Sequence, residues 1–463
     1  MQGWTAAPNK TKPVTLTLGD GLNQAMEPIE IGDGQGVSVL NLDSALYPTL
    51  QTRDGHTLLN QHFGYINRLF RFKGEWYCGN QRGLYRLTGG VWAALYDYGN
   101  DDNNRLWDAN IFFSGDKLYF LDGSLQLQQW DGTTLTALSS APAGSAFLTT
   151  HANRFYLANR SDNLLSFSGL RDAADWTSTN KYTGTGKITV ETADGELPTG
   201  LTSFSDHVIL FKRYTMHELF GEDSTNFTMT APYPVGCISD RSIVQNRTAL
   251  YWLGPDGMYE YQGGSSPVKI SEPIKTYIES INQANARHCC FGTDGRFLYV
   301  SLVTGGSQLP TVTLKYDIAG RRWWPCSFVA TSYYLDGQTL YMGTADGRIL
   351  QAGGSTDAGA AINWSIEPKP WSDGAETGRA ALHKFWVVAE IDPGAALSIA
   401  YAPGLAGDNW TTVTTLTNAD GVTRSYRVPV VVRTPETWFR SKLFGSGRVK
   451  IHRIIREVTR RNA

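Results

Sequence analysis

Six basic side chains near the C-terminus are the clearest candidates for binding a charged partner. They are Arg448, Lys450, Arg453, Arg456, Arg460 and Arg461. Guanidinium and ammonium groups bind phosphate and carboxylate oxygens, so this segment could contact DNA or an acidic neighbour. A solvated strand that ends in a frayed basic tail explains the same residues equally well. The sequence leaves both interpretations open.

Five aspartates lie in turns between short predicted strands, where a propeller glycosidase would carry its carboxylates. They are Asp116, Asp206, Asp256, Asp294 and Asp336. Such turns require Asp and Gly for backbone reasons alone. The repeated S-x-D-x-G-x-x-W boxes of sialidase-type propellers are absent, and no nucleophile–base pair is visible. We therefore interpret these residues as turn formers and predict no catalytic residues and no enzyme activity.

Two other segments contain possible metal ligands. His288, Cys289 and Cys290 are adjacent, but neighbouring residues of a strand point to opposite faces and cannot readily share one ion. The acidic stretch 97–104 matches no EF-hand spacing, so we expect a solvated loop there. The five cysteines include no C-x-x-C pair. The sequence thus predicts buried cysteines, no bound metal and no cofactor.

The overall composition excludes several classes of protein. The chain has 463 residues and a formal net charge of −2, so no polybasic surface marks it as a dedicated nucleic-acid binder. It contains no run of 18 apolar residues, and its N-terminus lacks a signal-peptide pattern. We therefore expect no membrane insertion and folding in a reducing cytoplasm. The 48 glycines, with abundant aromatic residues, are typical of an all-β protein.

A repeated unit predicts the fold. Each copy has an apolar strand, a polar turn, a second strand usually centred on Leu-Tyr, a Gly/Asp turn and a third strand. The centres are Tyr77, Tyr119, Tyr156, Ile209, Tyr251, Tyr299 and Tyr341, and they are spaced by 42, 37, 53, 42, 48 and 42 residues. This period matches one four-stranded propeller blade of about 40–50 residues. We predict a β-propeller of about seven blades over residues 56–352.

Three other segments do not follow the blade period. Residues 1–55 contain two candidate strands, VTLTLG and GVSVLNLD, and we expect an N-terminal arm or a strand that closes the ring of blades. In SEPIKTYIESINQANA, apolar residues recur with helical spacing, so we expect a helix of about three turns near 273–284. A small-residue linker (352–361) precedes a C-terminal region, 361–463, with alternating strands. This region predicts a β-sandwich domain.

Several short segments together resemble a known class of phage proteins. They are the Tyr-centred repeats, the segment ISEPIKTYIESIN, the segment GLRDAADWTS and the ending PETWFRSKLFGSGRVKIHRIIREV. This layout resembles phage head-to-tail β-propeller proteins, namely the packaged-DNA stabilisation (tail hub) protein of short-tailed phages and the related tail nozzle proteins. The resemblance covers most of residues 30–460, but no single motif is diagnostic.

The resemblance implies a structural role in the virion tail, after assembly in the host cytoplasm. The implied assembly is a homo-oligomeric, commonly hexameric ring below the portal and adaptor, which conducts DNA and retains it until ejection. Cyclic assembly requires two complementary lateral surfaces on each subunit. We expect the non-repeating parts to provide these surfaces. The alternative functions are a receptor- or glycan-binding propeller, with Trp107, Trp176, Trp323 and Trp324 as stacking candidates, and a propeller glycosidase.

Overall fold

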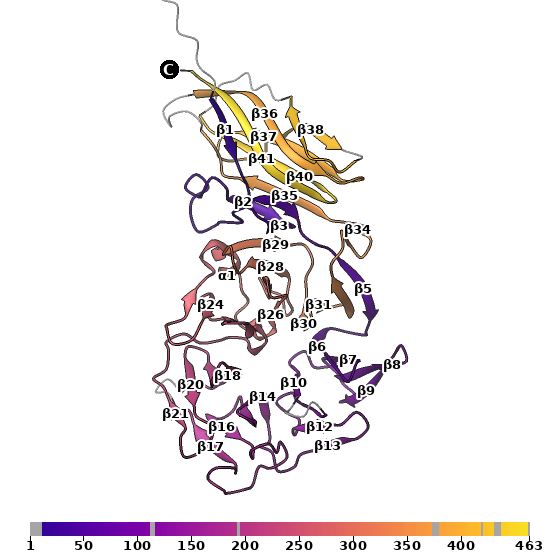
Figure 1. Cartoon of the computed structure of the whole chain (residues 1–463), viewed down its shortest axis with the longest axis vertical. Coiled ribbons are helices and arrows are strands. Elements are labelled where there is room, and N and C mark those ends of the chain that lie inside the picture. The colour runs from indigo at the N-terminus through magenta and orange to yellow at the C-terminus, as the bar shows by residue number, and fades with distance from the viewer. Residues whose placement is uncertain are drawn as a thin grey trace, which may run out of the picture.

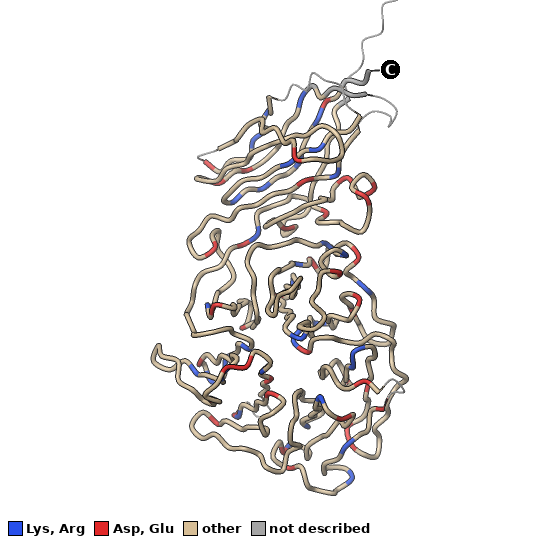
Figure 2. Tube along the Cα trace, turned by 180° about the vertical axis from the view of Figure 1, so that it is seen from behind, with Lys and Arg blue, Asp and Glu red and all other residues tan. Residues whose placement is uncertain are grey.

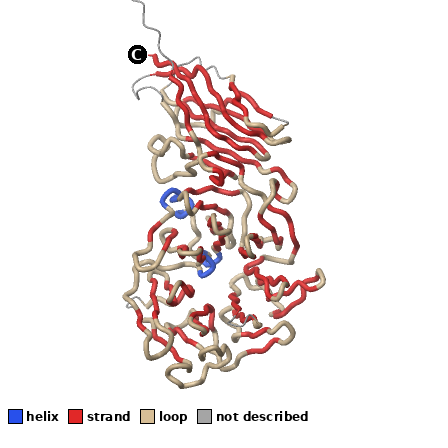
Figure 3. Tube along the Cα trace, viewed as in Figure 1, coloured by secondary structure: helices blue, strands red, loops and turns tan. Residues whose placement is uncertain are grey.

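The computed structural model describes residues 12–111, 116–191, 195–372, 379–417, 420–429 and 437–461. Its strands form two bodies, a ring of small sheets and a two-sheet sandwich above it (Figure 1). Strands predominate in both bodies (Figure 3). No helix within the described ranges has the length and apolar character needed to cross a membrane.

The ring contains seven antiparallel sheets that follow one another along the chain. Blade 1 consists of β6 (Ile66–Phe72), β7 (Glu75–Asn80), β8 (Gly83–Thr88) and β9 (Val91–Asp97). Blade 2 consists of β10 (Asp108–Ile111), β11 (Leu118–Leu121), β12 (Gln128–Trp130) and β13 (Leu135–Ala137). Blade 3 consists of β14 (Ser145–His151), β15 (Arg154–Asn159), β16 (Leu164–Phe167) and β17 (Gly186–Thr189).

The next three blades have the same order. Blade 4 consists of β18 (Pro198–Phe204), β19 (His207–Lys212), β20 (Met216–Phe220) and β21 (Thr228–Met229). Blade 5 consists of β22 (Val244–Asn246), β23 (Ala249–Leu253), β24 (Met258–Tyr261) and β25 (Val268–Lys269). Blade 6 consists of β26 (Cys290–Thr293), β27 (Phe297–Leu302), β28 (Val312–Asp317) and β29 (Arg322–Cys326).

The seventh blade combines both ends of the propeller segment. It contains β30 (Ser332–Asp336), β31 (Thr339–Gly343) and β32 (Arg348–Ala352), and its outermost strand is β5 (His56–Gln61), which pairs antiparallel with β32. The innermost strand, β30, packs against β6 of blade 1 and completes the ring. The predicted seven-bladed propeller is therefore confirmed. All seven repeat centres lie on the second strand of a blade.

The sandwich consists of two sheets. One sheet has the order β3 (Leu42–Leu46), β4 (Thr49–Thr52), β41 (Val449–Arg461), β36 (Arg379–Ile391) and β39 (Arg424–Val428), and β1 (Lys12–Leu16) also pairs with β41. The other has the order β2 (Gly36–Leu40), β35 (Asn363–Pro368), β40 (Phe439–Ser446), β37 (Ala396–Pro403) and β38 (Thr411–Thr417). The predicted C-terminal sandwich is confirmed, but its strands come from both ends of the chain.

The N-terminal segment differs from the expected arm. Over its described part, residues 12–55 supply β1 to β4 to the sandwich, while the strand that closes the propeller is β5. The physical reason is that β35 and β41 would otherwise be open edges; β2 covers the first, and β1 and β4 cover the second. The expected linker also has structure, because β33 (Thr356–Asp357) and β34 (Ala360–Ala361) form a small hairpin beside β5.

The helix between blades 5 and 6 is shorter than expected. A 3-10 turn, η2 (Glu272–Ile274), leads into α1 (Lys275–Glu279). The helix ends there because Ile281 forms a β-bridge with Thr304. The Pro273 carbonyl accepts a hydrogen bond from the amide of Gln24, so this segment packs against the N-terminal chain.

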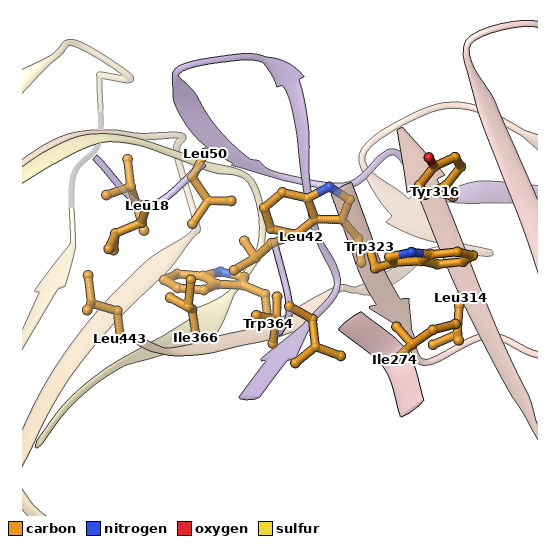
Figure 4. Close-up of a cluster of buried hydrophobic side chains, with 14 of the residues drawn as sticks. Leu18, Leu42, Leu50, Ile274, Leu314, Tyr316, Trp323, Trp364, Ile366 and Leu443 are labelled. Atoms are coloured by element: carbon orange, nitrogen blue, oxygen red, sulfur yellow. The ribbon is translucent and has the colours of Figure 1, made fainter. Parts of the chain in front are cut away.

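A single hydrophobic core continues from the sandwich into blades 5 and 6 (Figure 4). Leu42 and Trp364 of the sandwich and Trp323 of blade 6 are fully or almost fully buried in it. Buried polar contacts accompany the core at this junction. Lys315 Nζ of β28 lies 2.6 Å from Asp43 of β3, and the Trp324 indole donates to Ser44. The two domains therefore pack as one unit.

The chain crosses between the domains at a second buried contact. Both terminal nitrogens of Arg53, which is 2% exposed, donate to the carboxylate of Asp357 at 2.9 and 2.6 Å. The Nδ1 atom of His56 lies 3.1 Å from the same carboxylate. Burial alone would raise the pKa of Asp357, but His56 and Arg53 outweigh it and hold this pKa below its usual range. This ion pair fixes the strand that closes the propeller.

We predict that Asp357→Asn lowers the free energy of unfolding by about 3 kcal/mol, because it leaves the buried guanidinium of Arg53 without its counter-ion. Urea denaturation followed by tryptophan fluorescence measures the loss. The matched control is Asp346→Asn, which removes a half-exposed ion pair with Arg348 and should cost about 0.5 kcal/mol or less. Equal losses in the two variants would show that the Arg53 pair has no special role.

Candidate functional site at the propeller channel

The basic C-terminal residues do not form one surface patch. Arg448 pairs with Asp54, and Lys450 Nζ lies 2.6 Å from Glu390. The guanidinium of Arg456 is buried, 4.7 Å from the ring centroid of Trp371. Arg453 is exposed. Charges of both signs are spread over both domains (Figure 2).

A β-bulge explains why Arg456 lies inside the sandwich. Ile451 of β41 pairs with Ala389, but Arg453 pairs with Val388, so one extra residue shifts the alternation of the strand. Ile451 is buried before the bulge, and Ile454 and Arg456 are buried after it. The sequence pattern contains no signal for this shift. The backbones of Arg460 and Arg461 lie in β41, but their side chains fall outside the described residues.

The turn aspartates have contacts within their own blades or with the next blade. Asp294 accepts hydrogen bonds from the amides of Arg296 and Phe297 and from the Tyr299 hydroxyl. Asp336 pairs with Arg71 at 2.6 Å. These contacts have the form expected of turn residues.

The tryptophans that were candidates for sugar stacking are largely internal. Trp107, Trp323 and Trp324 are buried, and their indole nitrogens donate to Asn80, Ile270 and Ser44. Trp176 is half-buried and donates to the Ala173 carbonyl. Stacking of a sugar on the first three would require the core to open.

A buried hydrogen-bond network crosses one end of the propeller channel. Arg241, in η1 (Asp240–Ser242) ahead of blade 5, donates to the Tyr65 hydroxyl at 3.1 Å and to the Thr331 carbonyl at 2.7 Å. Tyr65 precedes blade 1 and Thr331 precedes blade 7. The Tyr65 hydroxyl lies 3.1 Å from Nδ1 of His288, in η3 (Ala286–His288) ahead of blade 6. We call Tyr65, Arg241, His288 and Thr331 the cross-channel network.

A second contact spans the same end of the ring. Arg287, next to His288, donates to the side-chain oxygen of Asn104 in the loop between blades 1 and 2. The loops of non-neighbouring blades are therefore joined directly across the axis. We infer that this end of the channel is blocked by protein.

Burial sets the protonation states in the network. It lowers the pKa of His288 to about 3, with further lowering by the positive charges of Arg241 and Arg287. It raises the pKa of Tyr65 to about 12. The neutral imidazole of His288 can then accept the hydrogen of Tyr65, whose oxygen accepts from Arg241. Protonation of His288 would remove this acceptor.

Inside the ring, a cavity of about 460 Å³ extends from the cross-channel network along the innermost strands. It is lined by the innermost strands β6, β10, β22, β26 and β30 and by η1. Arg241 lies at the blocked end, while Ile111 and Leu335 lie toward the other end of these strands and are 40% and 38% exposed. We call this space the channel cavity.

The His288-Cys289-Cys290 segment has a structural role. The Cys289 sulfur accepts from the Val303 amide, and Cys290 lies against the Ala330 carbonyl and lines the channel cavity. Burial raises the pKa of both thiols, so they stay protonated near neutral pH. Among the described residues, no group of three or more His, Cys, Asp or Glu is placed to hold a metal ion.

No family model and no curated protein matches this chain. Several solved structures are similar to it. The extracellular domain of BT4673 from B. thetaiotaomicron is 11% identical, with a TM-score of 0.46 over 64% of this chain and 39% of that one, so the similarity spans well under half of that protein. The Pan2 WD40 domain of Neurospora crassa is 10% identical, with a TM-score of 0.40 over 65% and 95%. The AfRom2 CNH domain is 7% identical, with a TM-score of 0.41 over 65% and 99%.

We predict that stability falls as pH decreases from about 6.5 toward 4, in part because of His288. The folded protein holds the pKa of His288 near 3, below the unfolded value of 6.5, so the unfolded chain binds the extra proton in this window. His62, whose pKa burial lowers to about 4, acts in the same direction. Between pH 7 and 4.5, His288→Asn should lose about 2 kcal/mol less than wild type in urea unfolding. An unchanged pH dependence would contradict the buried, neutral state of His288.

Proposed function

We propose that this chain is a structural subunit of a phage tail, a hub or nozzle protein below the portal and adaptor. It would form a homo-oligomeric ring that conducts packaged DNA and retains it until ejection. The proposal rests on the resemblance of several sequence segments to such proteins and on one structural observation. That observation is a rigid two-domain subunit whose sandwich has an open edge facing away from the propeller.

The open edge is formed by β38 and β39. Within the described residues, β38 pairs only with β37, and β39 only with β36. At the other side of the sandwich, β2 and β3 pack on β29 of the propeller. The segment TTVTTLT of β38 has no charged residue and no proline, which are the features that usually protect an edge strand. An unprotected edge is a suitable lateral surface for ring assembly.

The blocked channel limits where DNA could pass. Because the cross-channel network closes one end of the propeller ring, DNA would have to run between subunits and not through a propeller. The ion pairs of Arg448 and Lys450 within the sandwich also reduce the charge that β41 can offer to DNA. This agrees with a conduit that lets the polymer slide, since phosphate contacts by unpaired cations would retain it.

We predict that the purified chain forms rings, seen by negative-stain microscopy and sized by light scattering. Two lysines on the open edge, Thr412→Lys with Thr417→Lys, should weaken assembly by about tenfold or more, because each adds an uncompensated charge to the contact. Both threonines are exposed, so the melting temperature should change little.

The matched control places lysines on exposed threonines of two outer propeller strands, Thr57→Lys with Thr136→Lys, and should still form rings. A wild-type chain that stays monomeric at every concentration, with or without portal and adaptor, would contradict the proposed function. Rings that tolerate the β38 lysines would place the contact elsewhere on the subunit.

A further inference from the structure

Arg241 is a buried cation without a counter-ion. Its side chain is 9% exposed, and its hydrogen-bond partners, Tyr65 and the Thr331 carbonyl, are both neutral. Among the described residues, no carboxylate oxygen lies within 4 Å of its guanidinium. Buried charges in proteins are normally paired, because removing a charge from water is costly. An anion beside Arg241 would remove this cost.

The other charged residues that line the channel cavity have partners. The pairs are Arg68 with Asp108 at 3.2 Å, Arg71 with Asp336 at 2.6 Å, and Asp240 with Arg160 at 3.7 Å. Arg241 is thus the one cation of the lining for which the described residues supply no carboxylate. Its charge lies at the blocked end of the cavity, in the region of lowest solvent access.

The walls of the cavity between Arg241 and the open end are mainly apolar. Leu69, Phe70, Phe291 and Leu340 contribute to them, and Leu335 lies near the opening. The volume of about 460 Å³ is within the range of about 300–1,000 Å³ typical of small-ligand sites. Apolar walls that lead to one fixed charge are a common arrangement in such sites.

We propose that the channel cavity binds a small organic carboxylate with an apolar body, with its carboxylate on Arg241 and its hydrocarbon part along the innermost strands. This site is independent of the proposed ring assembly and would exist in the monomer. Phosphates and nucleotides fit poorly, because Asp240 lines the same end of the cavity and would repel a second negative charge. One uncompensated cation matches one carboxylate.

The test is isothermal titration of the purified full-length chain with 2-naphthoate. Naphthalene-2-methanol serves as a neutral compound of similar shape, and inorganic phosphate as an anion without an apolar body. We expect one naphthoate per chain, with the alcohol bound at least about tenfold more weakly, since the ion pair with Arg241 is lost. Absence of naphthoate binding, equal affinity for the alcohol, or tighter binding of phosphate would overturn the proposal.

Two variants locate the site. Arg241→Gln should reduce naphthoate affinity about tenfold or more and leave binding of the alcohol unchanged. Because Arg241 also holds the cross-channel network, a second variant leaves it untouched: Leu335→Trp narrows the opening and should also prevent binding. The control is Leu170→Trp, at a leucine of similar exposure (37%) that does not line the cavity. Wild-type affinity in Leu335→Trp would show that naphthoate binds elsewhere.

Discussion

The pairing of β5 with β32 is the constraint on which the rest of the structure depends. It completes the seventh blade, and only residues 53–55 separate β5 from β4 in the sandwich. A link this short cannot span a changing gap between the domains. The bidentate contact of Arg53 with Asp357 holds this link from the side of the linker hairpin. Closing the propeller therefore also fixes the sandwich in place.

The junction between the domains follows from this constraint. With β2 and β3 held against blade 6, the two hydrophobic cores merge around Trp323, Trp324 and Leu42, and the buried Lys315–Asp43 pair defines the register of the contact. A rigid subunit has one consequence for assembly. A ring built through the outer edge of the sandwich would hold every propeller in the same orientation.

The sequence predicted the repeating part of the molecule well and the non-repeating part less well. The seven Tyr-centred units identify the blades, because each blade repeats the same alternation of buried and exposed residues. The N-terminal strands were recognised as strands, but their partners lie more than 300 residues away, and local alternation says nothing about such pairing. The bulge that buries Arg456 is likewise set by the neighbouring strand. The cross-channel network has no motif, since Tyr65, Arg241 and His288 come from loops that differ from blade to blade.

The central claim is that propeller and sandwich form one cooperative unit fixed by the N-terminal segment. Differential scanning calorimetry of the full-length chain, in dilute solution at neutral pH, tests it most directly. We predict one unfolding transition, with a calorimetric enthalpy equal to the van't Hoff enthalpy. Two resolved transitions, one for each domain, would contradict the claim.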